Sequence, residues 1–327
     1  MCFLEKNTRM NYRTLGRTGL TVSVMGLGCG GHSRLGISQK KGDDNAVGIV
    51  RRALDIGINF IDTAEAYGTE PIVGRALQEA GERDAVVVSS KVSPRQNGLL
   101  RTADEIKEAV QAGLKRLQTD RIDIPQLHGV RETEYDYCRT ELVPALHDLR
   151  TSGAIRFSGI TEAFGPDPQH HMLLRAVEDD FWDVMMVGFN FVNQSARERV
   201  FTATQTKDIG VLDMFAVRRA LKTLPAMNAL LKDLAAKRAL PAAISAALQT
   251  GNPVGFLFDG DDPAIDIADG AYRFCRDEPG VHVVLSGTGS VEHLLANADS
   301  LTRPPLSESA TQKLRHLFEG IDSVSGN

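Results

Sequence analysis

The segment Asn59-Phe60-Ile61-Asp62-Thr63-Ala64-Glu65-Ala66-Tyr67-Gly68-Thr69-Glu70 leads from an apolar strand directly into acidic and phenolic side chains. Its apolar start predicts a buried strand, and the polar residues that follow predict a loop. Asp62 and Tyr67 occur in that loop, five residues apart. Such a pair is either ordinary loop polarity or half of an active site, and the surrounding sequence decides between these interpretations.

Helix-like and strand-like segments alternate on both sides of this segment. A short hairpin is expected over 12–23, and a helix is expected from Asp43 to the stop signal at Gly57. Thr102 caps another clear helix, whose apolar residues recur at helical spacing. Eight further strands are expected near residues 25, 59, 87, 123, 157, 185, 211 and 283. This alternation predicts an α/β protein, a (β/α)8 TIM barrel with an N-terminal β-hairpin and additional C-terminal helices.

The interval 223–278 is the least regular part of the pattern, because it holds predicted helices and no strand. It is compatible with an insertion in the barrel or with a doubly wound open sheet. The chain shows no low-complexity linker and no internal repeat. We therefore expect a single barrel domain over 1–327, with 1–11 as a flexible leader.

Composition narrows the class of function. The chain has 327 residues, of which 42% are hydrophobic and 24% charged, and its net charge is -5. These values are typical of a soluble globular protein and give no electrostatic case for binding nucleic acid or an anionic membrane. We expect a small-molecule substrate, and the composition contains no pattern that predicts an oligomeric state.

The cysteines and the apolar runs bear on location. The four cysteines lack any CxxC spacing, so neither a zinc site nor a disulfide framework is expected, and no metal is assigned. No run approaches the roughly 20 apolar residues of a membrane span, and the N-terminus lacks an apolar signal region. These features predict a cytoplasmic protein.

Polar residues at the ends of three successive predicted strands suggest an active site. Asp62 and Tyr67 follow the second strand, Lys91 follows the third and His128 the fourth. In a barrel these strand ends meet at the catalytic face. A lysine beside a tyrosine lowers the pKa of the phenol, an aspartate keeps the lysine charged, and a histidine orients the substrate oxygen or shares the proton. Taken singly each residue could be a cap or a solvated charge, but together they predict a proton-transfer site.

On these residues the chain resembles the aldo-keto reductases. The resemblance extends over nearly the whole length, from 15–23 through the motif at 57–68 to the last strand and helix. It implies Tyr67 as general acid and base, Asp62 and Lys91 as the groups that tune it, and His128 as the group that orients the carbonyl. It also implies a nicotinamide cofactor bound without a Rossmann fold, which agrees with the absence of a strand-linked GxGxxG.

The resemblance further implies that cofactor contacts come from the ends of the other strands. The expected contacts are Gly28, Cys29, Thr161, Glu162, Asn190, Met214, Phe215, Ala216, Arg218, Gly287, Thr288, Gly289, Ser290, His293 and Asn297. A phosphate suits the start of the helix expected over 291–299, where free amides and the positive end of the helix dipole lie. For Cys29 a buried structural thiol is the stronger interpretation, and for Arg218 a solvated helix start is an equal alternative.

Four positions depart from the family pattern. Thr161-Glu162 replaces a common Ser-Asn, Met186 replaces a common glutamine, and His293 stands where an arginine often binds a 2′-phosphate. A histidine cannot hold a phosphate in the bidentate manner of arginine, which weakens the case for NADP. NADP(H) is still slightly favoured over NAD(H), because the family commonly uses it.

The expected function is an NAD(P)-dependent oxidoreductase that interconverts a carbonyl (aldehyde, ketone or aldose) and its alcohol by hydride transfer. The direction of reaction and the physiological substrate remain open. The alternative is a nicotinamide-nucleotide-binding regulatory or redox-sensing subunit with little turnover. The presence of all four polar residues, Asp62, Tyr67, Lys91 and His128, favours the enzyme over the regulatory subunit.

Overall fold

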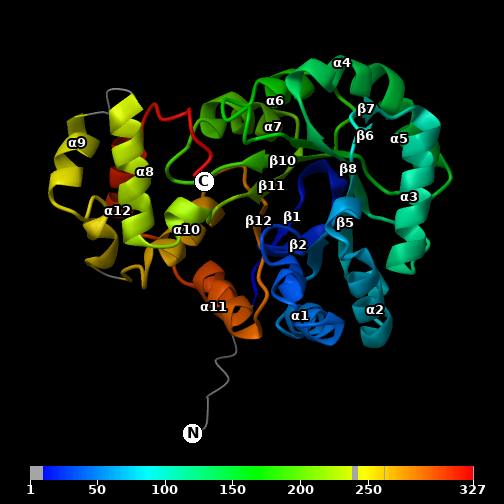
Figure 1. Ribbon diagram of the computed structural model, residues 1–327, viewed down its shortest axis with the longest axis horizontal. Helices are drawn as coiled ribbons and strands as arrows, with labels where there is room; N and C mark the ends of the chain where they lie inside the picture. Colours follow the sequence, from blue (N-terminus) through cyan, green and yellow to red (C-terminus); the bar gives the residue numbers. More distant parts are fainter. Residues whose placement is uncertain (1–9, 238–241, 261, 327) are drawn as a thin grey trace, which may run out of the picture.

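The computed structural model describes residues 10–237, 242–260 and 262–326. Eight parallel strands close into a barrel, surrounded by the helices that connect them (Figure 1). The barrel strands are β3 (Met25–Gly28), β4 (Phe60–Asp62), β5 (Val87–Val92), β8 (Ile124–Val130), β9 (Gly159–Glu162), β10 (Val184–Gly188), β11 (Gly210–Met214) and β12 (Val283–Ser286). The predicted (β/α)8 barrel is confirmed, and the closed sheet excludes the open, doubly wound alternative.

Several strands extend further toward the carboxyl end than the sequence pattern indicated. Lys91 pairs with Gln126 within β5 and β8, and Asp62 pairs with Ser89 across β4 and β5. Asp62, Lys91 and His128 were expected just after their strands and instead lie within them. The apolar pattern ends earlier than the backbone ladder in these strands, because β4, β5 and β8 carry the polar residues Asp62, Lys91 and His128 near their carboxyl ends.

The helices follow the predicted order. They are α1 (Asp43–Asp55), α2 (Glu70–Ala80), α3 (Ala103–Leu117), α4 (Tyr135–Tyr137), α5 (Val143–Thr151), α6 (His171–Ala176), α7 (Thr202–Thr206), α8 (Leu224–Lys237), α9 (Ala242–Gln249), α10 (Ile267–Arg276), α11 (Val291–Thr302) and α12 (Glu308–Leu317). Thr102 caps α3 through a complete capping box with Glu105. The helix expected over 141–150 is divided, since a π-helical turn at Cys138–Leu142 leads into α5.

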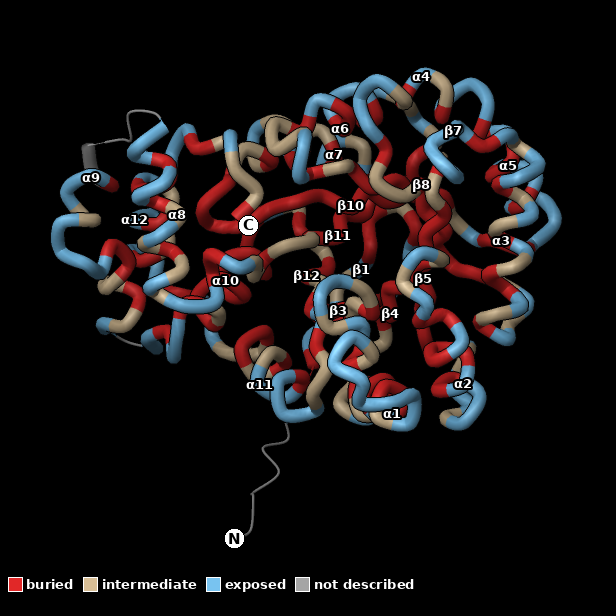
Figure 2. The backbone as a smooth tube through the Cα atoms, viewed as in Figure 1, coloured by how far each residue is buried: buried red, intermediate tan, exposed pale blue. Residues whose placement is uncertain are grey.

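A small hairpin closes the amino-terminal end of the barrel, where the amide of Arg17 in its turn donates to the carbonyl of Asp208, just before β11. It consists of β1 (Tyr12–Thr14) and β2 (Thr21–Ser23), as predicted. Its apolar side chains join the cluster that fills the barrel interior, made of Leu15, Leu20, Val22, Phe60, Val87, Ile124, Val184, Met186, Leu212 and Val283. Met186 is therefore part of the apolar core. Figure 2 shows the strands and the inner faces of the helices as the buried part of the molecule.

The leader expected over 1–11 falls mostly on residues 1–9, which lie outside the described part of the chain. Met10 is buried, and the carbonyl of Asn11 accepts a hydrogen bond from the amide of Val24. Met10 is thus packed in the core, and the exposed Asn11 is held by its backbone. No helix in the described ranges is long and apolar enough to cross a membrane.

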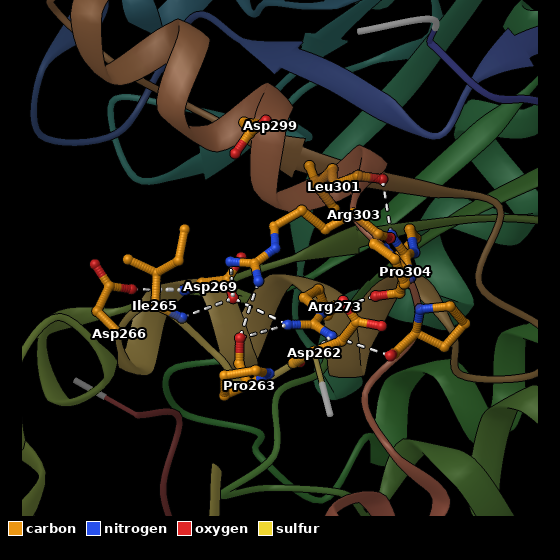
Figure 3. A network of polar contacts seen from close by, with 12 residues as sticks. Asp262, Pro263, Ile265, Asp266, Asp269, Arg273, Asp299, Leu301, Arg303 and Pro304 are labelled. Atoms are coloured by element: carbon orange, nitrogen blue, oxygen red, sulfur yellow. Dashed lines mark hydrogen bonds and ion pairs between the residues drawn. The ribbon is translucent and has the colours of Figure 1, made fainter. Parts of the chain in front are cut away.

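The irregular interval between β11 and β12 forms α8, α9 and α10, which lie with α12 at one side of the barrel (Figure 1). A polar network fixes the junction between α10 and α11 (Figure 3). The fully buried guanidinium of Arg273 donates to the carbonyl oxygens of Asp262 and Pro304, each at 2.9 Å, and to Asp269 Oδ2 at 3.2 Å. Arg303 binds the same carboxylate oxygen at 3.3 Å. Hydrogen bonds thus connect the helices between β11 and β12 to the segment that follows α11.

Candidate active site

The structure brings the four predicted catalytic residues together at the carboxyl end of the barrel. Lys91 Nζ lies 2.5 Å from Asp62 Oδ2, donates to the carbonyl of Thr63 at 2.8 Å, and lies 4.9 Å from the centroid of the Tyr67 ring. The Tyr67 hydroxyl lies 3.4 Å from His128 Nε2. A phenol, a cation and an imidazole therefore share one small volume, as proton transfer to a substrate oxygen requires.

The short 3-10 helix at Glu65–Tyr67 positions the phenol directly after β4. Gly68 ends this turn with a φ of 70°, a conformation that favours glycine. The Tyr67 ring lies over Gly30, where a Cβ atom would come within 2.3 Å of ring carbon Cε2. Gly30 is thus a site residue that its position in a glycine-rich turn could have indicated.

Glu65 anchors the same turn and was not predicted from the sequence. Its Oε1 accepts the backbone amide of Ser93 at 2.9 Å and the guanidinium of Arg101 at 2.8 Å. Because Ser93 follows β5, these bonds join the turn that carries Tyr67 to the end of the strand that carries Lys91. The only signal in the sequence was the position of Glu65 between Asp62 and Tyr67. A glutamate close to a tyrosine does not by itself indicate a functional site.

Asp62 and Lys91 form a buried ion pair. Burial raises the pKa of the Asp62 carboxyl, while the ammonium of Lys91 and the hydroxyl of Ser89 act to lower it. Burial also disfavours charge on Lys91, but Asp62 and Tyr67 outweigh it and raise the pKa of the ammonium. We conclude that Lys91 is a cation at neutral pH, because it has a charged partner and a carbonyl acceptor.

Burial changes the behaviour expected for Tyr67. The sequence predicted that Lys91 would lower the pKa of the phenol, and Lys91 does act in that direction. Burial acts more strongly, however, and the net result without cofactor is a raised pKa. The phenol therefore keeps its proton at neutral pH and is ready to act as an acid.

His128 is a neutral imidazole in this environment. Burial lowers its pKa to about 3, with smaller contributions from the positive charges of Lys91 and Arg95. Its neighbour Gly129 donates its amide to Thr161 Oγ1 at 2.6 Å, so Thr161 lies beside His128. A neutral histidine can either donate to or accept from a substrate oxygen, depending on its tautomer.

The segment Gly287–Ser290 fits a phosphate-bearing ligand. It leads directly into α11, whose first turn is capped by Ser290 Oγ accepting the amide of His293. Gly28 and Gly287 pack closely, since a Cβ on Gly287 would lie 3.0 Å from the carbonyl oxygen of Gly28. Lys41 Nζ donates to the carbonyl of Gly289 at 2.9 Å, which adds a cation from the loop before α1.

The loop after β11 carries Arg218, whose guanidinium forms no ion pair with the described residues. Arg218 stacks on the Phe215 ring at 3.7 Å from its centroid, and its buried Nη1 has no hydrogen-bond partner among the described residues. Burial lowers the pKa of this guanidinium, and no carboxylate in the described ranges opposes that effect. A cofactor phosphate would supply the missing acceptor, so the residue fits the expected ligand.

Some expected cofactor residues already use their polar groups within the protein. Asn190 Oδ1 accepts the amides of Val192 and Asn193, which fixes the turn after β10. The buried carboxylate of Glu162 accepts from His170 Nδ1, at 3.0 and 2.9 Å to its two oxygens, and from the amide of Gly188 at 2.7 Å. Both side chains thus have structural partners at the edge of the site.

The remaining expected contacts lie near the same end of the barrel. Asn297 donates to Ser286 Oγ at 2.9 Å, and Thr288 Oγ1 accepts the amide of Ser290 at 3.1 Å. Ala216 is buried, Met214 is half-buried and the side of α11 that carries His293 is exposed. The Cys29 thiol is fully buried, and burial raises its pKa, in agreement with a structural thiol.

Comparison with known proteins agrees with this geometry. A model of the aldo/keto reductase family matches residues 25–319. The chain is 31% identical to L-galactose dehydrogenase of Arabidopsis thaliana over 222 residues, which cover 66% of this chain and 68% of that protein. It is 38% identical to aldo-keto reductase YhdN of Bacillus subtilis over 168 residues, which cover 46% of this chain and 47% of that protein.

Solved structures agree as well. The holo form of aldo-keto reductase AKR11C1 from Bacillus halodurans has a TM-score of 0.73 and 27% identity, over 94% of this chain and 96% of that one. The fold, the family model and the named relatives support an NAD(P)-dependent oxidoreductase. On these grounds the chain belongs to the aldo/keto reductase family.

Proposed function

We propose that this protein interconverts a carbonyl group and the corresponding alcohol, with Tyr67 as the general acid and base. The observation that carries the proposal is the position of the Tyr67 hydroxyl, 3.4 Å from His128 Nε2, on a ring that Lys91 Nζ approaches to 4.9 Å from the centroid. A bound nicotinamide supplies or accepts the hydride. Tyr67 donates a proton to the substrate oxygen in reduction and removes it in oxidation.

The neighbouring groups make this proton transfer feasible in a buried site. Lys91 keeps a positive charge beside the phenol because Asp62 holds it in an ion pair, and that charge stabilises the phenolate left after donation. The neutral imidazole of His128 is within reach of the same hydroxyl and orients the substrate oxygen. Each of the four groups therefore has a distinct role.

We propose a small polar carbonyl compound, including aldoses, as the substrate class. The relative named L-galactose dehydrogenase supports a sugar. A charged pair also flanks the site, since Arg95 donates to the carbonyl of Gly129, next to His128, at 3.0 Å and is ion-paired with Glu134. Polar side chains at this position suit a hydroxylated substrate better than a large apolar one.

For the cofactor we propose NADP(H) in preference to NAD(H). The position expected to bind the 2′-phosphate carries His293, but Lys41 places its ammonium at Gly289, in the segment that caps α11. An exposed lysine can bind a phosphate as a point charge. Replacing Lys41 by alanine should weaken NADPH binding severalfold and leave NADH binding unchanged, as measured by calorimetric titration, and an equal effect on both cofactors would contradict this role.

The experiment that tests the function follows deuterium from C4 of the reduced nicotinamide to the product, with a panel of aldehydes, ketones and aldoses. Transfer of the label to the carbonyl carbon supports the proposal. Tight cofactor binding with negligible turnover on the whole panel would favour the regulatory or redox-sensing alternative. Absence of binding of both cofactors would exclude both functions.

A further inference from the structure

A chain of hydrogen bonds runs inside the barrel beneath the proposed active site. Gln126 Nε2 donates to Ser89 Oγ at 2.7 Å, and Ser89 Oγ donates to Asp62 Oδ1 at 3.2 Å. The three residues come from β8, β5 and β4, and none is more than 4% exposed. Neither Ser89 nor Gln126 reaches Tyr67 by a hydrogen bond, so both lie outside the set of groups assigned above.

The chemistry of these groups fixes the direction of the chain. The ionised carboxylate of Asp62 can only accept, so the single hydroxyl hydrogen of Ser89 is committed to it. Ser89 must then accept from Gln126, whose amide nitrogen donates. The two oxygens of Asp62 thus have separate partners, Oδ1 with Ser89 and Oδ2 with Lys91.

We propose that Ser89 and Gln126 are positioning residues that keep Asp62 ionised and oriented toward Lys91, and that act through this pair on Tyr67. The inference rests on the proposed function for its effect on turnover. It concerns residues that touch neither substrate nor cofactor in the proposed arrangement. Their role is to preserve the charge on Lys91 by preserving its counter-charge.

Gln126 is a polar side chain in an interior that is largely filled by apolar residues. The other inward-facing cluster of the barrel is apolar and includes Ile124, on the same strand as Gln126, and Met186. Gln126 Oε1 is buried without a partner among the described residues, and an orphaned acceptor of this kind costs about 1–3 kcal/mol. An apolar side chain would avoid that cost, so the amide nitrogen has to provide a compensating interaction.

The neighbouring strand is adapted to the same side chain. Gly159 of β9 pairs with Gln126, and a Cβ atom at that glycine would lie 2.7 Å from Gln126 Cγ. The absence of a side chain at Gly159 thus makes room for Gln126 in the orientation that reaches Ser89. Two strands therefore contribute to one hydrogen bond, which agrees with a positioning role.

The test compares Ser89→Ala and Gln126→Leu with Ser90→Ala as a matched control. Ser90 lies on the same strand but faces outward, where it donates to Glu70 of α2 at 2.6 Å. We expect kcat to fall on the order of tenfold in the first two variants, with a shifted pH profile and unchanged cofactor affinity. Ser89→Thr keeps the hydroxyl and should have the wild-type pH profile of kcat. Ser90→Ala should have the wild-type profile as well.

A second measurement needs no turnover. The phenolate fraction of Tyr67 at a fixed alkaline pH is read from the ultraviolet difference between each protein and its Tyr67→Phe counterpart. Without Ser89 the Asp62 carboxylate is no longer held toward Lys91 and can rotate away from it, so the ammonium loses part of its counter-charge. The phenolate fraction should then fall, because Lys91 is the main group that favours phenolate.

The outcomes separate the two proposals. An unaltered pH profile and an unaltered phenolate fraction in folded Ser89→Ala and Gln126→Leu would overturn the positioning role. If one variant does not fold, the other decides, because each breaks a different bond of the chain. A wild-type protein without turnover would contradict the proposed function, while the phenolate measurement would still decide the role of Ser89.

Discussion

Asp213 is a buried carboxyl group on β11, a strand whose neighbouring residues Leu212 and Met214 face the barrel interior. Its two oxygens make no hydrogen bond of normal geometry in the described part of the chain, although the Cys275 thiol and the Phe189 amide act weakly to favour the carboxylate. Burial raises the pKa of Asp213 well above its ordinary value. The folded protein therefore retains a proton that the unfolded chain releases.

This linkage predicts how Asp213→Asn alters stability with pH. Between the ordinary pKa of aspartate and the raised pKa in the fold, wild-type stability decreases with pH by up to about 1.4 kcal/mol per unit. The asparagine variant lacks this loss. The melting temperature of the variant minus that of wild type should therefore increase as pH rises from mildly acid to neutral. Thermal melts across that range provide the measurement, and a difference independent of pH would contradict the assignment.

Gly30 is the residue over which the Tyr67 ring lies. In Gly30→Ala the added Cβ would come within 2.3 Å of Cε2 and 2.5 Å of Cζ, so the ring has to move. We expect at least a tenfold loss of turnover with little change in melting temperature, because a small misplacement of a catalytic group is costly. Gly31→Ala is not a suitable control, since Gly31 has a φ of 69°.

At the scale of elements, α2 and α3 pack closely at Gly74. A Cβ on Gly74 would lie 2.5 Å from the carbonyl oxygen of Leu117, and this backbone atom cannot rotate away. Gly74→Ala should therefore lower the free energy of unfolding by about 1–3 kcal/mol, in spite of the better helix propensity of alanine. Chemical denaturation measures this change.

Gly48 in α1 provides the matched control, because it is exposed and a Cβ there would meet nothing within 4 Å. Gly48→Ala should stabilise the protein by roughly 0.5–1 kcal/mol. Equal effects of both substitutions would show that helix propensity, and not the packing of α2 on α3, determines the result at Gly74.

Local signals predicted most elements, and the misses have physical reasons. Helical periodicity and the cap at Thr102 placed α3 to within a residue. The ends of the strands were misplaced, because their last inward positions hold polar site residues such as Lys91. The hairpin of β6 (Arg95–Gln96) and β7 (Leu99–Leu100) was missed, although Asn97-Gly98 between them is a recognised turn signal.

At the scale of the whole molecule, the number and order of strands sufficed to predict the barrel, and the barrel brought together residues that are distant in sequence. The meeting of Asp62, Tyr67, Lys91 and His128 followed from this topology. The bonds of Glu65 to Arg101 and of Glu162 to His170 could not be predicted, because they depend on loop conformations and on the left-handed backbone of His170.

We propose that the barrel and helices α8–α12 unfold as one domain. Arg273 links the inserted helices to the segment after α11 through its bonds to Asp262, Asp269 and Pro304 (Figure 3). Arg273→Leu would remove the donor to the carbonyl oxygens of Asp262 and Pro304, would leave Asp269 with the weaker partner Arg303, and should cost about 3–5 kcal/mol. Calorimetry should show one transition in wild type and a lower one in the variant, whereas separate melting of α8–α12 in wild type would contradict a single domain.

The most direct test of the central claim is a single-turnover measurement of nicotinamide oxidation by wild type and by Tyr67→Phe, on an accepted carbonyl substrate, with cofactor affinity measured in parallel. The substitution removes only the hydroxyl that lies 3.4 Å from His128 Nε2. We predict unchanged cofactor affinity and a rate reduced by about 10²–10⁴, the usual contribution of a general acid. A Tyr67→Phe protein that binds cofactor normally and turns over at the wild-type rate would contradict the assignment of Tyr67 as the proton donor.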